Sequence, residues 1–177
     1  GVPFDGAEVY DADDFVQLEA VPASLIVVGA GVIGCEYASM FAALGVAVTL
    51  IEPRDTLLGF LDREVAAALQ ACFVELGITM RFGVSLQRCV VAGPDDVQCI
   101  LSDGSELHGE KLLFAAGRTG NTAGLGLETV GIEPDGRGQI HVDEHYRTPC
   151  PSIYAAGDVI GFPALASTSM DQGRVAV

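Results

Sequence analysis

The sequence predicts an α/β fold: a Rossmann-like parallel sheet with flanking helices and a small antiparallel β excursion. The first observation behind this prediction is a continuous apolar run at 24–29, which is typical of a parallel strand buried on both faces. The second is a stretch of small and apolar residues at 31–44 that suits a helix packed on a sheet and stops at Gly45. The third is another apolar run at 46–51, which completes a βαβ unit.

Helix caps and turn residues indicate the elements that follow. Asp62 suits a helix start and Gly77 a helix stop, so we expect a helix at 62–76. Over 84–109, apolar and polar residues tend to alternate, and turn residues interrupt the pattern. This predicts a small antiparallel excursion. The other expected elements are strands at 78–81, at 111–116, near 140–142 and at 153–156, and a helix at 164–177.

Composition and charge restrict the function classes. The chain has 177 residues, half of them hydrophobic, which is enough for one buried core and argues against disorder. Its formal charge is −15, so we expect neither nucleic acid nor an anionic membrane surface as a partner. Five cysteines without a C-x-x-C pair predict free thiols in a reducing cytoplasm and no metal site. The first residue, Gly1, is not a methionine, so we expect a fragment or a processed piece.

The turn at 29–34 reads Gly-Ala-Gly-Val-Ile-Gly and matches G-x-G-x-x-G, the fingerprint of dinucleotide-binding loops. Its position between a strand and a helix makes the match specific. Gly29 allows the tight turn, Gly31 lets the backbone approach a pyrophosphate, and Gly34 lets the helix pack close to the strand. We therefore expect this loop to bind a dinucleotide.

Two features beside the loop bear on the ligand. The helix begins at Val32 and Ile33, where unpaired N–H groups and roughly half a positive charge favour a phosphate. Glu52 ends the second strand, where its carboxylate can accept hydrogen bonds from both ribose hydroxyls of NAD(H) and repels a 2′-phosphate. Arg54 could turn toward such a phosphate, so NADP(H) stays open as a second ligand.

Four further segments carry a family resemblance: Gly34–Ser39, Phe60–Asp62, Gly117–Thr122 and Ala155–Ala176. With the glycine loop, they make the chain similar to the pyridine nucleotide–disulfide oxidoreductase family over its entire length, and most similar to the soluble transhydrogenase branch. The resemblance implies an enzyme that passes hydride between nicotinamide nucleotides through FAD, as a homodimer in the cytoplasm. Two alternatives stay open: an NAD-dependent disulfide oxidoreductase like lipoamide dehydrogenase, and an isolated dinucleotide-binding module without catalysis.

The resemblance also implies a domain organisation. Residues 1–22 resemble a connector from the FAD domain and are expected to be irregular, with a possible short helix. Residues 23–143 resemble the NAD(P)-binding domain, and residues 144–177 resemble the return into the FAD domain. The partners would then be the nicotinamide nucleotides and the remaining FAD and interface domains of a longer parent, without which we expect the fragment to be inactive.

On the nicotinamide side, the resemblance assigns roles to five residues. Glu36 is the implied catalytic residue, near the hydride-transfer site and paired with a lysine that lies outside this chain. Val32 stands where some relatives have an aromatic gate over the nicotinamide pocket. Ala116, Gly117 and Arg118 resemble the stretch that ends the last strand of the domain and passes close to the dinucleotide.

On the FAD side, Gly157 and Asp158 resemble the second FAD motif of the family. Asp158 would hold the ribityl chain by hydrogen bonds. Ala164, Leu165 and Ala166 would start a helix whose N–H groups face the pyrimidine edge of the flavin, where a reduced flavin carries negative charge.

Overall fold

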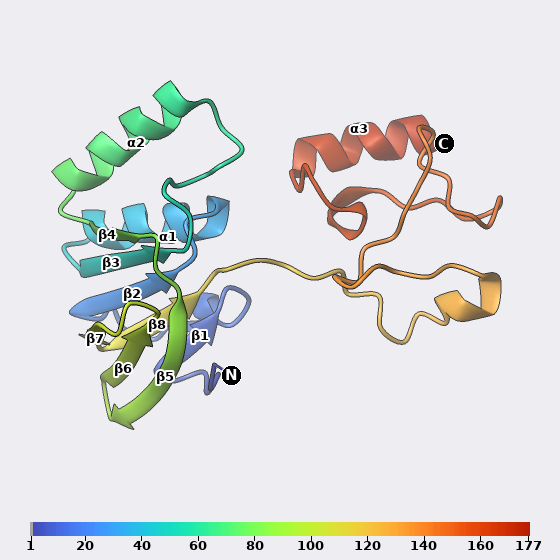
Figure 1. Ribbon diagram of the computed structural model, residues 1–177. Coiled ribbons are helices and arrows are strands. Elements are labelled where there is room, and N and C mark those ends of the chain that lie inside the picture. The colour runs from blue at the N-terminus through green and yellow to red at the C-terminus, as the bar shows by residue number, and fades with distance from the viewer. Residues whose placement is uncertain (1) are drawn as a thin grey trace. The chain divides into compact units, whose positions relative to one another are not determined.

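A computed structural model describes residues 2–177, and the chain divides into two compact units, Gly1–Gly117 and Arg118–Val177. The first unit carries two β-sheets and two α-helices, and the second carries one α-helix and much irregular backbone (Figure 1). The division after Gly117 does not coincide with the boundaries expected at 22/23 and 143/144. Those boundaries stay predictions.

The first unit has three layers, with a five-stranded parallel sheet in the middle (Figure 1). In spatial order its strands are β1 (Val9–Asp11), β8 (Lys111–Phe114), β2 (Ser24–Val28), β3 (Ala47–Glu52) and β4 (Thr79–Phe82). One face carries the helices α1 (Val32–Ala43) and α2 (Arg63–Glu75). The other face carries an antiparallel sheet of β5 (Leu86–Gly93), β6 (Asp96–Leu101) and β7 (Glu106–Gly109). The predicted fold class is confirmed.

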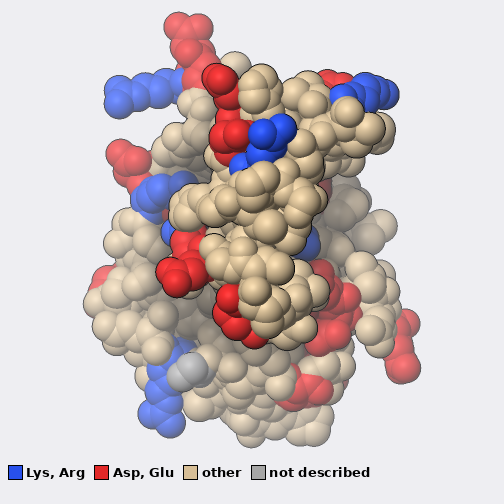
Figure 2. All heavy atoms as spheres, turned by 90° about the vertical axis from the view of Figure 1, so that its right-hand side faces the viewer, with Lys and Arg blue, Asp and Glu red and all other residues tan. Residues whose placement is uncertain are grey.

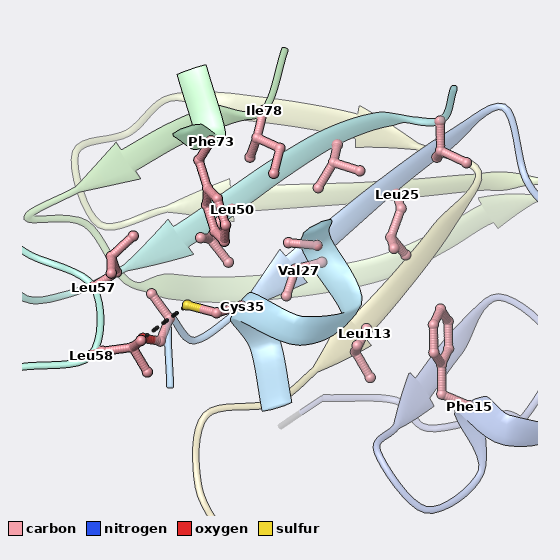
Figure 3. Packing of buried hydrophobic residues seen from close by; sticks show 14 of the residues in the cluster. Phe15, Leu25, Val27, Cys35, Leu50, Leu57, Leu58, Phe73, Ile78 and Leu113 are labelled. Atoms are coloured by element: carbon pink, nitrogen blue, oxygen red, sulfur yellow. Dashed lines mark hydrogen bonds between the residues drawn. The ribbon is translucent and has the colours of Figure 1, made fainter. Parts of the chain in front are cut away.

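The apolar run that forms β2 is continuous because both faces of this strand are buried. Leu25 and Val27 join the cluster that packs under the helices, part of which Figure 3 shows. Ile26 and Val28 point the other way and pack against residues of the antiparallel sheet. Each such side chain contributes about 1.5–3 kcal/mol when it is fully buried. The strand that leads into the glycine loop is therefore firmly held from both sides.

The N-terminal segment differs from the expected irregular connector. Val9 and Tyr10 are buried in β1, which pairs in parallel with β8 and forms the edge of the central sheet. The short helix is present as the 3-10 turn η1 (Phe15–Gln17), and the Phe15 ring packs 5.1 Å from the ring of Tyr37 on α1. A three-residue strand among acidic residues is too short to show a hydrophobic period, which is why the sequence does not reveal it.

In the second unit, two expected strands are absent. No strand forms near 140–142, because the Ile140 N–H donates to the Val159 carbonyl and Asp143 Oδ1 accepts turn N–H groups instead. No strand forms at 153–156 either; Tyr154 makes one isolated bridge to Arg147. The helix expected at 164–177 is present as α3 (Ala166–Ala176), and η2 (Leu127–Val130) and η3 (Gly157–Ile160) are short 3-10 turns. Apolar residues in these segments fill a small core without extended pairing.

The surface carries the excess of acidic residues. On the face drawn in Figure 2, acidic side chains are spread among uncharged ones, and Lys and Arg do not gather into one basic patch. Within residues 2–177, no helix has the length and apolar character needed to cross a membrane.

Candidate functional site

The glycine loop joins the end of β2 to the first turn of α1, as the sequence predicts. A Cβ atom at Gly34 would collide with the carbonyl oxygen of Gly29, and one at Gly29 would stand 2.6 Å from the carbonyl oxygen of Ala115. Gly31 differs from both, since a Cβ there meets no atom within 4 Å among the described neighbours. The fold therefore requires glycine at 29 and 34, whereas beside 31 it leaves open space.

The first turn of α1 contains no side chain that caps the helix or offsets the positive end of its dipole. Gly31 is the N-cap residue in extended backbone, no side chain caps the helix, and the first turn has no acidic residue. A helix of this length presents about half a positive charge at its N-terminus. The main-chain N–H groups of Val32 and Ile33 are therefore available to an anion, and their contact with a pyrophosphate stays a prediction.

Glu52 ends β3 beside the loop, and its side chain is only 4% exposed. Its Oε2 accepts a hydrogen bond from the main-chain N–H of Ala30 at 2.8 Å, which ties the strand end to the glycine loop. Burial opposes ionisation of this carboxyl, but hydrogen bonds from Arg54 and Ala30 outweigh it and hold the Glu52 pKa below its usual value. Glu52 is therefore a carboxylate at neutral pH, where the sequence predicts ribose binding.

Arg54 donates the other hydrogen bonds to the Glu52 carboxylate. Its Nε lies 2.7 Å from Glu52 Oε1 and its Nη2 lies 3.3 Å from Oε2, so one edge of the guanidinium faces the carboxylate. The main-chain N–H of Arg54 also donates to Oε1, at 3.2 Å. On sequence grounds Glu52 is a single negative charge that repels a 2′-phosphate. In the structure that charge is paired, and the net charge of the two side chains is zero.

The end of β8 lies against the glycine loop. The Ala115 N–H donates to the Val28 carbonyl at 2.8 Å, which continues the pairing of β8 with β2. The Cα atom of Ala116 lies 2.8 Å from the place that a Cβ of Gly29 would take, and Gly117 follows with a φ of 143°. The structure thus brings Ala116 and Gly117 next to the loop, and their contact with a dinucleotide stays a prediction.

Glu36 lies on the exposed face of α1, one turn after Val32. Both side chains line an open, mainly apolar pocket of about 330 Å³ between α1 and α2, together with Cys35 and Leu58. The Cys35 thiol points inward and donates to the Ala30 carbonyl at 3.5 Å, the hydrogen bond drawn in Figure 3. The catalytic role that the resemblance implies for Glu36 stays a prediction.

In the second unit, Gly157 is held by a residue that the sequence reasoning missed. Its N–H donates to the side-chain Oε1 of Gln172 at 2.7 Å, and Gln172 is a buried residue of α3. A Cβ at Gly157 would stand 3.1 Å from the hydroxyl of Ser169, so the turn packs directly on the helix. A glutamine within a helix that carries few apolar residues gives no sequence signal for this contact.

The other FAD-side residues lie around the same turn and helix. Asp158 Oδ2 is 3.8 Å from the Nε of Arg118, which belongs to this second unit. Ala164 precedes α3, Leu165 is its N-cap residue without a side-chain cap, and Ala166 is its first residue. An exposed carboxylate and an uncapped helix N-terminus fit the polar groups of a flavin nucleotide, and the assignment stays a prediction.

Curated proteins resemble the chain over almost its whole length. One is the soluble pyridine nucleotide transhydrogenase of Mycobacterium bovis (strain BCG / Pasteur 1173P2), which is 49% identical over 176 residues, or 99% of this chain and 37% of the relative. Another, of the same name, comes from Pseudomonas putida (strain GB-1) and is 51% identical over 176 residues, or 99% of this chain and 38% of the relative. The chain thus spans less than two fifths of the length of these relatives.

Solved structures and a family comparison agree with this likeness. LpdA from Mycobacterium tuberculosis matches with a TM-score of 0.91 and 35% identity, over 99% of this chain and 38% of that protein. The HOCl-induced flavoprotein disulfide reductase RclA from Escherichia coli matches with a TM-score of 0.85 and 33% identity, over 94% of this chain and 38% of that protein. Residues 2–173 match the family described as pyridine nucleotide-disulphide oxidoreductase. The chain therefore belongs to the pyridine nucleotide-disulphide oxidoreductase family.

Proposed function

We propose that this chain binds a nicotinamide dinucleotide on its glycine loop. The observation that carries the proposal is Gly31, which has an ordinary extended backbone and no neighbour within 4 Å of a Cβ position. The packing of the described residues does not require glycine at position 31. Close approach of a pyrophosphate to the backbone would require it.

The surrounding residues have complementary roles in this proposal. The N–H groups of Val32 and Ile33 hold the pyrophosphate at the positive end of α1. Glu52, anchored to the loop through Ala30, accepts hydrogen bonds from the adenosine ribose. Ala116 keeps the end of β8 small where the ligand passes. A nicotinamide bound in this way would supply the hydride, and the role of these residues is to fix its position.

We further propose that the full-length protein is an FAD-dependent transhydrogenase that passes hydride between NAD(H) and NADP(H). The names of the curated relatives and the neutral pair of Glu52 and Arg54 support this activity. Asp158 and the first turn of α3 would hold the FAD, with the remaining FAD and interface domains completing a cytoplasmic homodimer.

A second candidate is an NAD-dependent flavoprotein that reduces a disulfide. The likeness to RclA, which is a flavoprotein disulfide reductase, favours this class, and the Glu52 carboxylate favours NAD(H) over NADP(H). The two candidates differ in the final electron acceptor.

Steady-state kinetics of the full-length protein distinguish them. We expect NADPH to reduce thio-NAD rapidly without any disulfide substrate. The absorbance of the reduced analogue measures this reaction. No thio-NAD reduction, together with NADH-dependent reduction of lipoamide, would refute transhydrogenation and support the second candidate.

A further inference from the structure

Arg54 lies between Glu52 and Gly59, and the space that it occupies depends on the glycine. A Cβ atom at Gly59 would stand 3.3 Å from Nη1 of Arg54, which is a tight contact, and 3.7 Å from its Cδ, which is an ordinary van der Waals distance. The φ of Gly59 is not positive, so its backbone accepts any residue. The absence of a side chain at 59 therefore serves to make room for the guanidinium.

We propose that Arg54 is the specificity-determining residue that admits a 2′-phosphate, and hence NADP(H), to a site whose Glu52 selects for NAD(H). The proposal rests on the proposed function of the glycine loop. It adds a role for Arg54 and for the space above Gly59.

Charge and geometry both support this role. The buried carboxylate of Glu52, if it stood alone, would disfavour a second negative group beside the ribose. Arg54 neutralises it with the Nε and Nη2 edge of its guanidinium. A guanidinium carries five N–H groups, so the Nη1 end remains for a second anion, and the side chain is 56% exposed. One arginine can therefore face a carboxylate on one edge and a phosphate on the other.

The same pairing limits the affinity for NAD(H). Ala30 and Arg54 together place four hydrogen bonds on the two carboxylate oxygens of Glu52. A carboxylate offers about four acceptor positions, so the ribose hydroxyls can bind Glu52 only when a donor leaves. The Nη2 hydrogen bond of Arg54, at 3.3 Å, is the longest of the four. NAD(H) thus competes with Arg54, whereas NADP(H) uses it.

The test compares the dissociation constants of NADH and NADPH for variants of the full-length protein by isothermal titration calorimetry. The flavin is reduced beforehand under anaerobic conditions, so that the nucleotides bind without transferring hydride to it. We expect Arg54→Met to weaken NADPH binding at least tenfold and to leave NADH binding equal or tighter, because the side chain that competes for Glu52 is gone. Arg88→Met is the matched control, because Arg88 is an exposed arginine on β5 and its loss changes the net charge equally. Equal weakening of both nucleotides by Arg54→Met, or the same effect from Arg88→Met, would overturn the proposal.

Gly59→Val tests the geometry with every charge retained. Its side chain should displace the guanidinium and again lower the NADPH affinity selectively, at least fivefold relative to NADH. If Arg54→Met fails to fold, Gly59→Val decides the question, and an unchanged ratio overturns the proposal. Gly31→Ser distinguishes failure of the proposed binding site from failure of the proposed role of Arg54. Normal binding of both nucleotides by this variant would refute the glycine loop as the binding site.

Discussion

Replacing Gly31 by serine should stabilise the fold while it removes nucleotide binding. Gly31 is the N-cap of α1 with φ −78° and ψ −174°, a conformation that suits serine, and no described atom lies within 4 Å of its Cβ position. Serine is a better N-cap than glycine by a few tenths of a kcal/mol. It also restricts the unfolded chain, which adds about 0.4–1 kcal/mol. We expect a net gain of about 0.6–1.4 kcal/mol in the free energy of unfolding.

The same side chain would fill the space that the pyrophosphate needs. We expect NADH affinity to fall at least tenfold, which corresponds to about 1.4 kcal/mol. Urea unfolding measures the first effect on the full-length protein. NADH fluorescence titration measures the second on the same protein with its flavin reduced beforehand, so that NADH is not oxidised. Gly93→Ser is the matched control, because Gly93 on β5 also lacks neighbours within 4 Å and has no positive φ. A destabilised Gly31→Ser variant would contradict the open space beside Gly31. A variant that binds NADH normally would show that this space is not a pyrophosphate site.

Three further predictions concern single residues. The fold lowers the pKa of Glu52, so its ionisation stabilises the native state above about pH 4.3 and this contribution is lost as the pH falls through the lowered pKa. Urea unfolding should therefore show Glu52→Gln less stable than the wild type at pH 7, with a difference that shrinks as the pH is lowered into the acid range; a difference that does not shrink contradicts this. Gln172→Leu leaves the Gly157 N–H without its acceptor and should lower the unfolding free energy by about 1–3 kcal/mol, and an unchanged urea midpoint would count against that hydrogen bond. Burial and the nearby charges of Glu52 and Glu36 raise the Cys35 pKa to about 11, so a thiol reagent should modify exposed Cys72 and spare Cys35 until unfolding, as mass spectrometry can check. Equal modification of both thiols in the folded protein would contradict it.

The sequence predicts the first unit well where its patterns are long. The apolar runs of β2 and β3 are continuous because helices cover one face of the sheet and the antiparallel sheet covers the other. The Asp62 cap is present, since its side chain accepts the Glu64 N–H at 2.8 Å. The glycine loop is equally accessible to sequence reasoning, because Gly29 and Gly34 are required by local packing.

Short or long-range contacts are where sequence reasoning fails. β1 has three residues, and its partner β8 lies about a hundred positions away in the chain. In the second unit, apolar residues such as Ile140 suggest strands, although their backbone groups bond to turns. The pairing of Arg54 with Glu52 depends on rotamers, and the Gln172 contact depends on tertiary packing. None of these leaves a periodic pattern.

A crystal structure of the full-length protein with bound NADH would show whether the glycine loop holds the nucleotide. We expect the pyrophosphate to accept hydrogen bonds from the N–H groups of Val32 and Ile33 beside Gly31. We also expect a ribose hydroxyl within hydrogen-bond distance of Glu52, with at least one hydrogen bond from Arg54 to Glu52 broken. NADH bound away from the glycine loop, or bound there with all four hydrogen bonds to Glu52 intact, would contradict the proposed site.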